Sequence, residues 1–415
     1  MNSPESAAAG APPFSSLTPD RLLDALESAG LRGDGRLVAL NSYENRVYLV
    51  YLDEPWPALA ADGVLLESDH DDAPVPLTAG HDAQQVRPRP LSSVVVKFYR
   101  KGRWTDAQIH EEHQFVRELA AHDIPAIAAI ALSGHDTSDG TAMVAARARS
   151  DAQTRADAGQ LQPDAATLAS AAAPRARQTL VHFEDLRFAA YRRAGGRAPE
   201  LDRPEVLDWI GRFLGRIHSI GARARFAERA AITIASHGEA PRDWLLASGL
   251  IPADLQVPWQ TVVDQALDAV RACYQRCGET AVLRLHGDCH AGNILWTDAG
   301  PHFVDFDDAC MGPAIQDLWM LLSGDRESMS QQLDDLLKGY EQMRAFDRRE
   351  LGLLEPLRTL RMIHYSAWIA RRWQDPAFPA AFTWFGTDRY WQDQILALRE
   401  QIALMQDEPL TLARN

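Results

Sequence analysis

The sequence predicts an α+β fold with two lobes, a sheet-plus-helix lobe followed by a mostly helical one. Residues 37–52 and 94–99 are rich in β-branched and aromatic side chains, as strands are. The sequence from Thr105 to Gln108 then has the form of a capping box, which predicts the start of a helix. Across residues 206–218, apolar side chains recur at three- and four-residue intervals, which is typical of an amphipathic helix.

The predicted elements divide the chain into a tail and two lobes. Residues 1–13 lack the basic start and apolar core of a signal peptide, so we expect a disordered tail. Thr18, followed by a proline, predicts the start of the first helix, and Gly30 predicts its end. We expect an N-terminal lobe over residues 14–193 and a C-terminal lobe over residues 194–415.

Two segments of the N-terminal lobe have the composition of insertions. Residues 53–92 contain many Pro, Asp and Gly residues and little apolar periodicity. Residues 136–178 are rich in Ala, Asp, Gln, Ser and Arg, a composition that predicts a mobile surface segment but also permits some helix. At the surface, both segments would alter a partner or substrate surface.

Residues 284–293 and the acidic triplet that follows them carry the strongest chemical signal. The spacing of His286, Asp288 and Asn293 matches the kinase catalytic loop, in which the Asp accepts the substrate hydroxyl proton and the Asn holds Mg²⁺. Asp305 begins an Asp-Phe-Asp triplet twelve residues after Asn293, where kinases have Asp-Phe-Gly. We predict that Asp288 is the catalytic base, that Asp305 is also catalytic, and that Asn293 and Asp305 are Mg²⁺ ligands.

A hairpin is predicted between Asn293 and Asp305. Residues 294–296 and 302–304 are strand-like and flank a turn at 297–300. Such a hairpin would bring the two proposed ligands together beside one metal site.

Two other interpretations of this segment remain open. One is a buried turn whose Asp and Asn residues cap backbone groups. The other is a transition-metal site, because four adjacent side chains are possible ligands: His286, Asp288, Cys289 and His290.

A kinase also needs a strand lysine for the ATP phosphates and a glutamate on the following helix to pair with it. Lys97 ends an apolar, β-branched run and is the phosphate-contacting candidate. Glu112 falls on the apolar face of the helix predicted from Thr105, whereas Glu111 falls on the polar face. Because a buried acid needs a cation, we predict Glu112 as the partner of Lys97. A snorkelling lysine with a solvated glutamate is the alternative.

The remaining nucleotide contacts are less distinctive. No Gly-x-Gly-x-x-Gly precedes the lysine strand, and residues 40–48 stand in its place. There the Ser42 hydroxyl and backbone amides can hydrogen-bond a phosphate, although an ordinary hairpin turn fits this stretch equally well. Residues 188–191 are the candidate hinge, whose backbone at Ala190 would meet adenine.

Together these stretches resemble the bacterial stress response kinase A family, within the aminoglycoside phosphotransferase and choline kinase-like group. The matching stretches cover nearly all of the chain from Phe14 onward except the two insertions: residues 40–48, 95–100, 111–115, 195–197, 211–218, 283–296 and 312–322. The resemblance implies a protein-kinase-like fold and a cytoplasmic, monomeric serine/threonine protein kinase that uses ATP and Mg²⁺. It also implies a link to envelope or oxidative stress and to protection from stress-induced cell death.

The resemblance also assigns residue roles. The family's proton acceptor falls on Asp288, its metal ligands fall on Asn293 and Asp305, and its ATP-loop serine falls on Ser42. Asp317 stands where kinase-like folds have an acid that anchors the backbone of the catalytic loop, although it also fits a plain acid at a helix start.

Composition restricts the partners. The formal net charge of −15 argues against nucleic-acid binding, for which a basic stripe would be expected, and would favour basic protein substrates. No stretch approaches the roughly twenty apolar residues of a membrane span, so we expect no membrane partner. Four scattered cysteines do not form a disulfide framework, which predicts a reducing, cytoplasmic location.

The aromatic residues between 354 and 391 leave the identity of the phosphate acceptor undecided. In the choline kinase-like group this region helps to wall the acceptor site, which predicts an aromatic-lined pocket, while helix core is the alternative. A small-molecule phosphotransferase acting on an amino alcohol, sugar or antibiotic is the second functional hypothesis, and an acidic-aromatic pocket beside Asp288 would favour it. A nucleotide-binding scaffold with little catalysis is the third.

Overall fold

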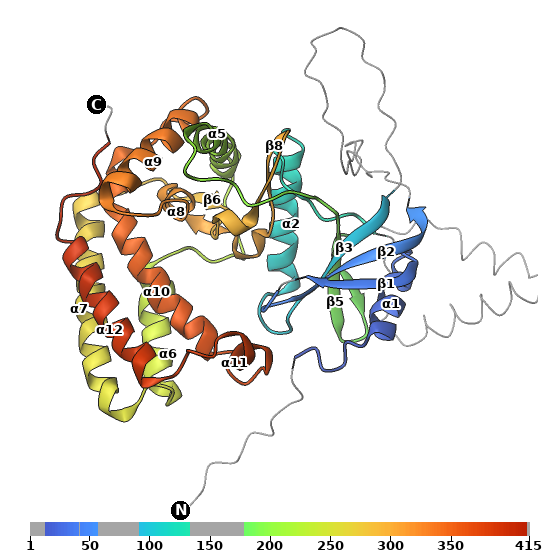
Figure 1. Ribbon diagram of the computed structural model, residues 1–415, viewed down its shortest axis with the longest axis horizontal. Helices are drawn as coiled ribbons and strands as arrows, with labels where there is room; N and C mark the ends of the chain where they lie inside the picture. The colour runs from blue at the N-terminus through green and yellow to red at the C-terminus, as the bar shows by residue number, and fades with distance from the viewer. Residues whose placement is uncertain (1–12, 41, 57–90, 133–177, 413–415) are drawn as a thin grey trace, which may run out of the picture. The chain divides into compact units, whose positions relative to one another are not determined.

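The computed structural model describes residues 13–40, 42–56, 91–132 and 178–412. These residues form two compact units (Figure 1). The first contains the described residues up to His113 together with Ala128–Ala194, and the second contains Gln114–Ile127 and Gly195–Asn415.

The first unit is a five-stranded antiparallel sheet with a helix against it. The strands, in sheet order, are β1 (Gly33–Leu40), β2 (Arg46–Trp56), β3 (Leu91–Phe98), β5 (Leu186–Arg192) and β4 (Val181–Phe183). Helix α1 (Pro19–Ser28) begins as predicted, because Thr18 Oγ1 accepts the amide of Arg21 at 3.3 Å. Its Leu22 and Leu26 are buried in one core with Val94, Val96 and other side chains of the sheet.

Helix α2 (Asp106–Ala120) begins at the predicted capping box. The Thr105 amide donates to the Gln108 side chain at 2.9 Å, and the Gln108 amide donates to the Thr105 hydroxyl at 3.2 Å. The predicted apolar face is confirmed, since Glu112 is buried and Glu111 is only partly covered.

The division into units differs from the predicted lobe boundary, because residues 114–127 group with the second unit. The reason lies in their contacts there. Phe115 packs edge-on against Phe226 and Phe306, and the amide of Ile127 donates to the carbonyl of Phe303 at 3.1 Å.

The insertion boundaries also need correction. Residues 53–56 and 91–92 belong to strands β2 and β3, because the antiparallel pairing of these strands extends past the predicted ends. The rest of 53–92 and all of 136–178 except Gln178 lie outside the described residues, as do residues 1–12. Gln178 forms an antiparallel bridge with Leu132.

The second unit is mostly helical, as predicted. Its helices are α5 (Pro204–Gly221), α6 (Ala240–Ser248), α7 (Ala253–Cys277), α8 (Ile315–Trp319), α9 (Arg326–Tyr340), α10 (Leu354–Ala370), α11 (Ala377–Ala381) and α12 (Asp388–Leu404). A π-helical turn, Ala235–Glu239, leads directly into α6. Two short antiparallel pairs complete the unit: β6 (Leu283–Leu285) with β9 (Cys310–Gly312), and β7 (Ile294–Thr297) with β8 (Gly300–Phe303). The β7–β8 pair confirms the predicted hairpin.

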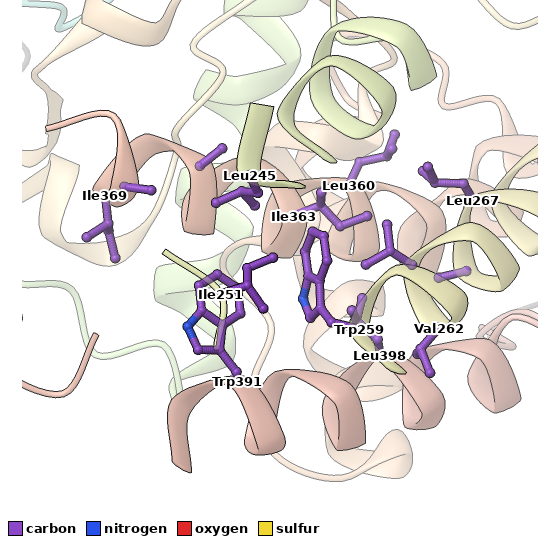
Figure 2. Close-up of a cluster of buried hydrophobic side chains, with 14 of the residues drawn as sticks. Leu245, Ile251, Trp259, Val262, Leu267, Leu360, Ile363, Ile369, Trp391 and Leu398 are labelled. Carbon is purple, nitrogen blue, oxygen red and sulfur yellow. The ribbon is translucent and has the colours of Figure 1, made fainter. Parts of the chain in front are cut away.

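A large hydrophobic core of the second unit lies among α6, α7, α10 and α12. Figure 2 shows Leu360 and Ile363 of α10 packed with Trp259 of α7 and Trp391 of α12. Trp391, Phe378, Phe382 and Phe385 are buried, so helix core is the correct interpretation for these aromatics. Tyr365 and Trp384, by contrast, are exposed.

Helices α5 and α9 approach each other so closely that glycine is required between them. A Cβ atom on Gly211 of α5 would stand 1.9 Å from the carbonyl oxygen of Leu336, and one on Gly339 of α9 would stand 1.8 Å from that of Asp208. Backbone atoms fill both spaces, so no side-chain rotation can relieve the clash.

We predict that Gly211→Ala lowers the free energy of unfolding by about 1–3 kcal/mol, the usual cost of overpacking, because one helix has to move. Denaturant unfolding of the purified protein measures this loss. The control is Gly352→Ala, whose new Cβ would meet only Pro409 Cγ at 4.0 Å. Equal stability of the two variants would contradict the packing argument.

Candidate active site

Asp317 fixes the backbone of the predicted catalytic loop. Its carboxylate is fully buried, with one oxygen accepting the Gly287 amide at 2.8 Å and the other accepting the His286 amide at 2.9 Å. The second oxygen also lies 3.0 Å from Nε2 of His218. Burial alone would raise the pKa of Asp317, but the hydrogen bonds and the neighbouring imidazoles lower it overall. The expectation that Asp317 anchors the loop is therefore confirmed.

Gly287 adds a steric constraint to the loop. Its φ of +85° lies in the left-handed region, and a Cβ there would stand 2.1 Å from the carbonyl oxygen of Asp308. Its own carbonyl accepts Nε2 of Gln316 at 3.0 Å. The loop is thus held from two sides, by α8 and by the turn at 306–308.

His286 ties the loop to the end of the hairpin. It is fully buried, its Nε2 lies 2.9 Å from the carbonyl oxygen of Val304, and its ring packs on Phe306 with centroids 4.3 Å apart. The acidic triplet that starts at Asp305 follows Val304 directly. His286 is therefore a positioning residue in this arrangement, and its backbone and ring are both engaged.

Asn293 and Asp305 lie close together, as the hairpin predicted. The Val304 amide donates to the Asn293 carbonyl at 3.1 Å, which places the start of the acidic triplet beside Asn293. Asp305 has a φ of +60°, an uncommon conformation for a residue other than glycine and one that Asp tolerates better than most.

The donor atoms around this point fit Mg²⁺. The Asn293 side-chain nitrogen donates to the Asp288 carbonyl at 3.0 Å, which orients the amide so that its oxygen remains for a cation. An amide oxygen and a carboxylate are hard ligands, and Mg²⁺ binds one or two such groups while it keeps several waters. Among the described residues, no three His, Cys, Asp or Glu side chains cluster as a transition-metal site would require.

Asp288, the predicted base, faces two basic side chains. One carboxylate oxygen lies 2.7 Å from Nη2 of Arg361, and the other lies 3.5 Å from Nε2 of His290. The contact with Arg361 is an ion pair without good hydrogen-bond alignment. Burial would raise the pKa of Asp288, but the His290 hydrogen bond and the Arg361 charge hold it well below its usual range.

Sequence reasoning missed Arg361. It lies on α10, far along the chain from the loop, among other arginines and with no motif around it. Only the packing of α10 against α6 and α7 brings it to Asp288.

In the first unit, Lys97 and Glu112 occupy the expected elements. Lys97 lies in β3 between Val47 of β2 and Ala189 of β5, and its Nζ is 5.7 Å from the ring centroid of Tyr191. Glu112 is 4% exposed, which is deep for a carboxylate, and one of its oxygens lies 3.7 Å from His113 Nε2. The pairing of Lys97 with Glu112 stays a prediction.

Ser42 lies in the turn between β1 and β2. Its hydroxyl donates to the carbonyl of Asn45 at 3.0 Å, and the Asn45 side chain in turn accepts the Arg100 amide at 3.0 Å. The turn is thus braced by its own short polar residues, as expected from its composition. The role of Ser42 towards a phosphate stays a prediction.

The hinge prediction is wrong in its position. Residues 188–191 lie inside strand β5, where Val96 pairs with Ala190, and the Ala190 carbonyl accepts the Ile130 amide at 2.8 Å. A buried mid-strand residue whose carbonyl is already bonded is a poor partner for adenine. The strand continues to Arg192, which pairs with Val94 of β3.

Comparison with known proteins decides the family. A profile described as the phosphotransferase enzyme family matches residues 75–166 and 135–354. The chain belongs to this family. It is also 36% identical over 399 residues to stress response kinase A of Escherichia coli (strain K12), a match that covers 96% of this chain and 97% of that protein. The same identity and coverage hold for the serine/threonine protein kinase RdoA of Salmonella typhimurium (strain LT2).

Solved structures agree on the fold. The amicoumacin kinase hAmiN, in complex with AMP-PNP, Ca²⁺ and Ami, has a TM-score of 0.58 at 17% identity, over 94% of this chain and 95% of that one. A microcompartment-associated aminopropanol kinase has a TM-score of 0.55 at 14% identity, over 94% and 97%. The kinase-like phosphotransferase fold predicted from the sequence is confirmed. In the part of the chain that the structure describes, no helix is long and apolar enough to cross a membrane.

A buried acid supports the helix that carries Asp317. Glu350 is 2% exposed, and one of its oxygens accepts the amide of Ile315, the first residue of α8, at 2.9 Å. Burial, with a smaller contribution from Asp347, raises the pKa of Glu350 to about 7. Unfolding restores the ordinary value, so the folded protein binds the proton more tightly than the unfolded chain does.

We predict that this group stabilises the protein below about pH 4.5 and that its contribution is lost as pH rises through about 7. Glu350→Gln keeps the acceptor oxygen without a charge, so it should stabilise the protein at pH 8, by up to a few kcal/mol, and have little effect near pH 4.5. Thermal unfolding of both proteins across this range measures the difference. Glu400→Gln, an exposed change on α12, is the control, and a destabilised Glu350→Gln at pH 8 would contradict the assignment.

Proposed function

We propose that this protein is a serine/threonine protein kinase that transfers the γ-phosphate of ATP to protein hydroxyls with Mg²⁺ and acts in a stress response. The observation that carries the proposal is the fixed loop on which Asp288 and Asn293 stand, braced by Asp317 and joined to Asp305 through the hairpin. The choice of a protein acceptor is supported by the relatives named stress response kinase A and serine/threonine protein kinase RdoA. Four free cysteines fit action in the cytoplasm, and we propose a monomer.

Asp288 would receive the hydroxyl proton of the acceptor. As the hydroxyl oxygen bonds to the γ-phosphorus, the bond to the β–γ bridging oxygen breaks, ADP leaves, and the proton moves to the Asp288 carboxylate. A carboxylate with a lowered pKa is ionised but weakly basic, which suits a loose transition state in which orienting the hydroxyl matters most. His290 and Arg361 would hold the carboxylate in place.

Asn293 and Asp305 would hold the metal, and Lys97 and Ser42 would contact the phosphates, with Glu112 orienting Lys97. Mg²⁺ would neutralise charge on the phosphate oxygens. Since the Ala190 carbonyl is occupied, we move the proposed adenine contact to the backbone that follows β5, at residues 193–194.

Asp288→Asn should lower phosphate transfer by about 10² to 10⁴ and leave ATP binding in place, because it removes the proton acceptor while it keeps the shape. Transfer of labelled γ-phosphate from Mg·ATP to protein acceptors, to the enzyme itself and to a panel of small alcohols measures this. Asp298→Asn, the same change on the exposed hairpin turn, is the control. Undiminished transfer in Asp288→Asn would refute its role, and Asp288-dependent label only on a small alcohol would replace the protein acceptor with a metabolite or antibiotic.

Asp305→Asn should weaken Mg²⁺-dependent nucleotide binding by tenfold or more, since one anionic ligand is lost. Asn is chosen because it tolerates the left-handed backbone at this position, whereas Ala would add strain. Calorimetric titration with ATP, with and without Mg²⁺, separates the metal-dependent part of the affinity. An unchanged Mg·ATP affinity would count against Asp305 as a ligand.

A further inference from the structure

Helix α10 presents basic and aromatic side chains along one face that starts at the proposed base. Positions 361, 364, 365, 368, 371 and 372 follow one another at three- and four-residue intervals and share one side of the helix and of the turn that ends it. We call these residues the α10 face: Arg361, His364, Tyr365, Trp368, Arg371 and Arg372. Because Arg361 lies 2.7 Å from Asp288, one end of the α10 face adjoins the position at which an acceptor hydroxyl would react.

Several cations act together on this face. The ring of His364 stacks on His237 of the π-helical turn, with centroids 4.4 Å apart and an interplanar angle of 23°. Burial and the charges of Arg371, Arg361 and Arg372 lower the pKa of His364 to about 4, against the opposing effect of Asp308. Burial and, to a smaller extent, the neighbouring His364 and Arg361 lower the pKa of His237 to about 3. Both imidazoles are thus neutral at pH 7, and the arginines supply the positive charge.

Aromatic rings hold the arginines along the α10 face. Tyr365 stacks on Trp368 with centroids 5.6 Å apart and an interplanar angle of 12°. The Arg372 guanidinium lies 5.2 Å from the Trp368 ring centroid, and that of Arg371 lies 5.4 Å from the centroid of Trp244 on α6. Tyr365 is 37% and Trp244 is 36% exposed, so this surface is open to a partner. Guanidinium groups on ring faces remain able to bind carboxylates in their own plane.

One carboxylate on the same helix has a partner of its own, since Glu355 lies 3.0 Å from Arg358, one turn before Arg361. Beside Asp288 the structure therefore places the guanidinium of Arg361. A cationic acceptor would meet Arg361 at close range and be repelled, whereas an anionic one would be attracted.

We propose that the acceptor is an acidic segment of a protein, in which Asp or Glu residues near the reacting Ser or Thr pair with Arg361 and, farther along, with Arg371. This inference rests on the proposed kinase function and names its substrate class. It reverses the expectation of basic substrates that the net charge suggested. At contact distance the local side chains outweigh charges that lie farther away than the screening length of about 8 Å.

The test compares three peptides that share one serine and differ only in flanking residues, which are Asp and Glu, Ala and Gln, or Lys and Arg. With full-length enzyme and Mg·ATP, kcat/KM for the acidic peptide should exceed that for the neutral one by about tenfold or more, and the basic peptide should be poorest. Arg361→Gln should lower kcat for all three peptides alike, because Asp288 loses a contact, and should remove most of the preference through KM for the acidic peptide. Arg371→Gln should reduce it several-fold.

Arg399→Gln is the matched control, because it removes an exposed arginine from α12 in the same unit and should keep the preference. Equal use of the acidic and neutral peptides, or preference for the basic one, would overturn the inference while the kinase function stands. A preference that survives Arg361→Gln would overturn the role of the α10 face.

A second comparison, with small alcohols as acceptors, distinguishes failure of the acidic-segment inference from failure of the proposed kinase function. If no peptide is labelled but a small alcohol is, in an Asp288-dependent manner, the protein-kinase function fails, and the acidic-segment inference fails with it. In that case, preference for amino alcohols would also refute an anionic acceptor. Preference for phosphorylated or carboxylated alcohols would support an anionic acceptor that is a small molecule and not a peptide.

Discussion

The buried carboxylate of Asp317 is the interaction on which the active-site geometry of the second unit depends. It accepts two consecutive backbone amides and faces His218, whose other nitrogen lies 3.0 Å from the Tyr340 hydroxyl. An ionised group so deep is tolerated because two backbone amides donate to it and an imidazole nitrogen lies within hydrogen-bond distance. Since those amides belong to His286 and Gly287, the carboxylate sets the direction in which the chain leaves β6 and therefore the position of Asp288.

Oxygen ligands and cations are segregated around Asp288. The loop and hairpin supply Asn293 and Asp305, whose oxygens suit a hard divalent ion. Helix α10 supplies Arg361, which suits an anion. These two demands differ in sign and fall on two elements of the second unit. Asp288 contacts both, since its carbonyl accepts the Asn293 side-chain amide and its carboxylate pairs with Arg361.

The hydrophobic core determines where α10 places its charges. Leu360, Ile363, Ala367 and Ala370 are buried against α6, α7 and α12, and Figure 2 shows this side of the helix in contact with Trp259 and Trp391. Burying these side chains fixes the rotation of the helix about its axis and therefore the side on which Arg361, His364 and Tyr365 lie. The polar face is thus a consequence of the apolar one, and dense packing leaves little freedom to turn it.

The sequence by itself determined the local features: the capping box of α2, the β7–β8 hairpin, the buried face with Glu112 and the spacing of Asp288, Asn293 and Asp305. Each depends on neighbours within a few residues, where periodicity and turn chemistry act directly. It also suggested Asp317, through resemblance to kinase-like folds. The end of β5, the grouping of residues 114–127 and the contact of Arg361 with Asp288 were decided only by tertiary structure. These depend on strand pairing and helix packing between distant segments, and one arginine among many on a helix carries no local sign of the carboxylate that it will meet.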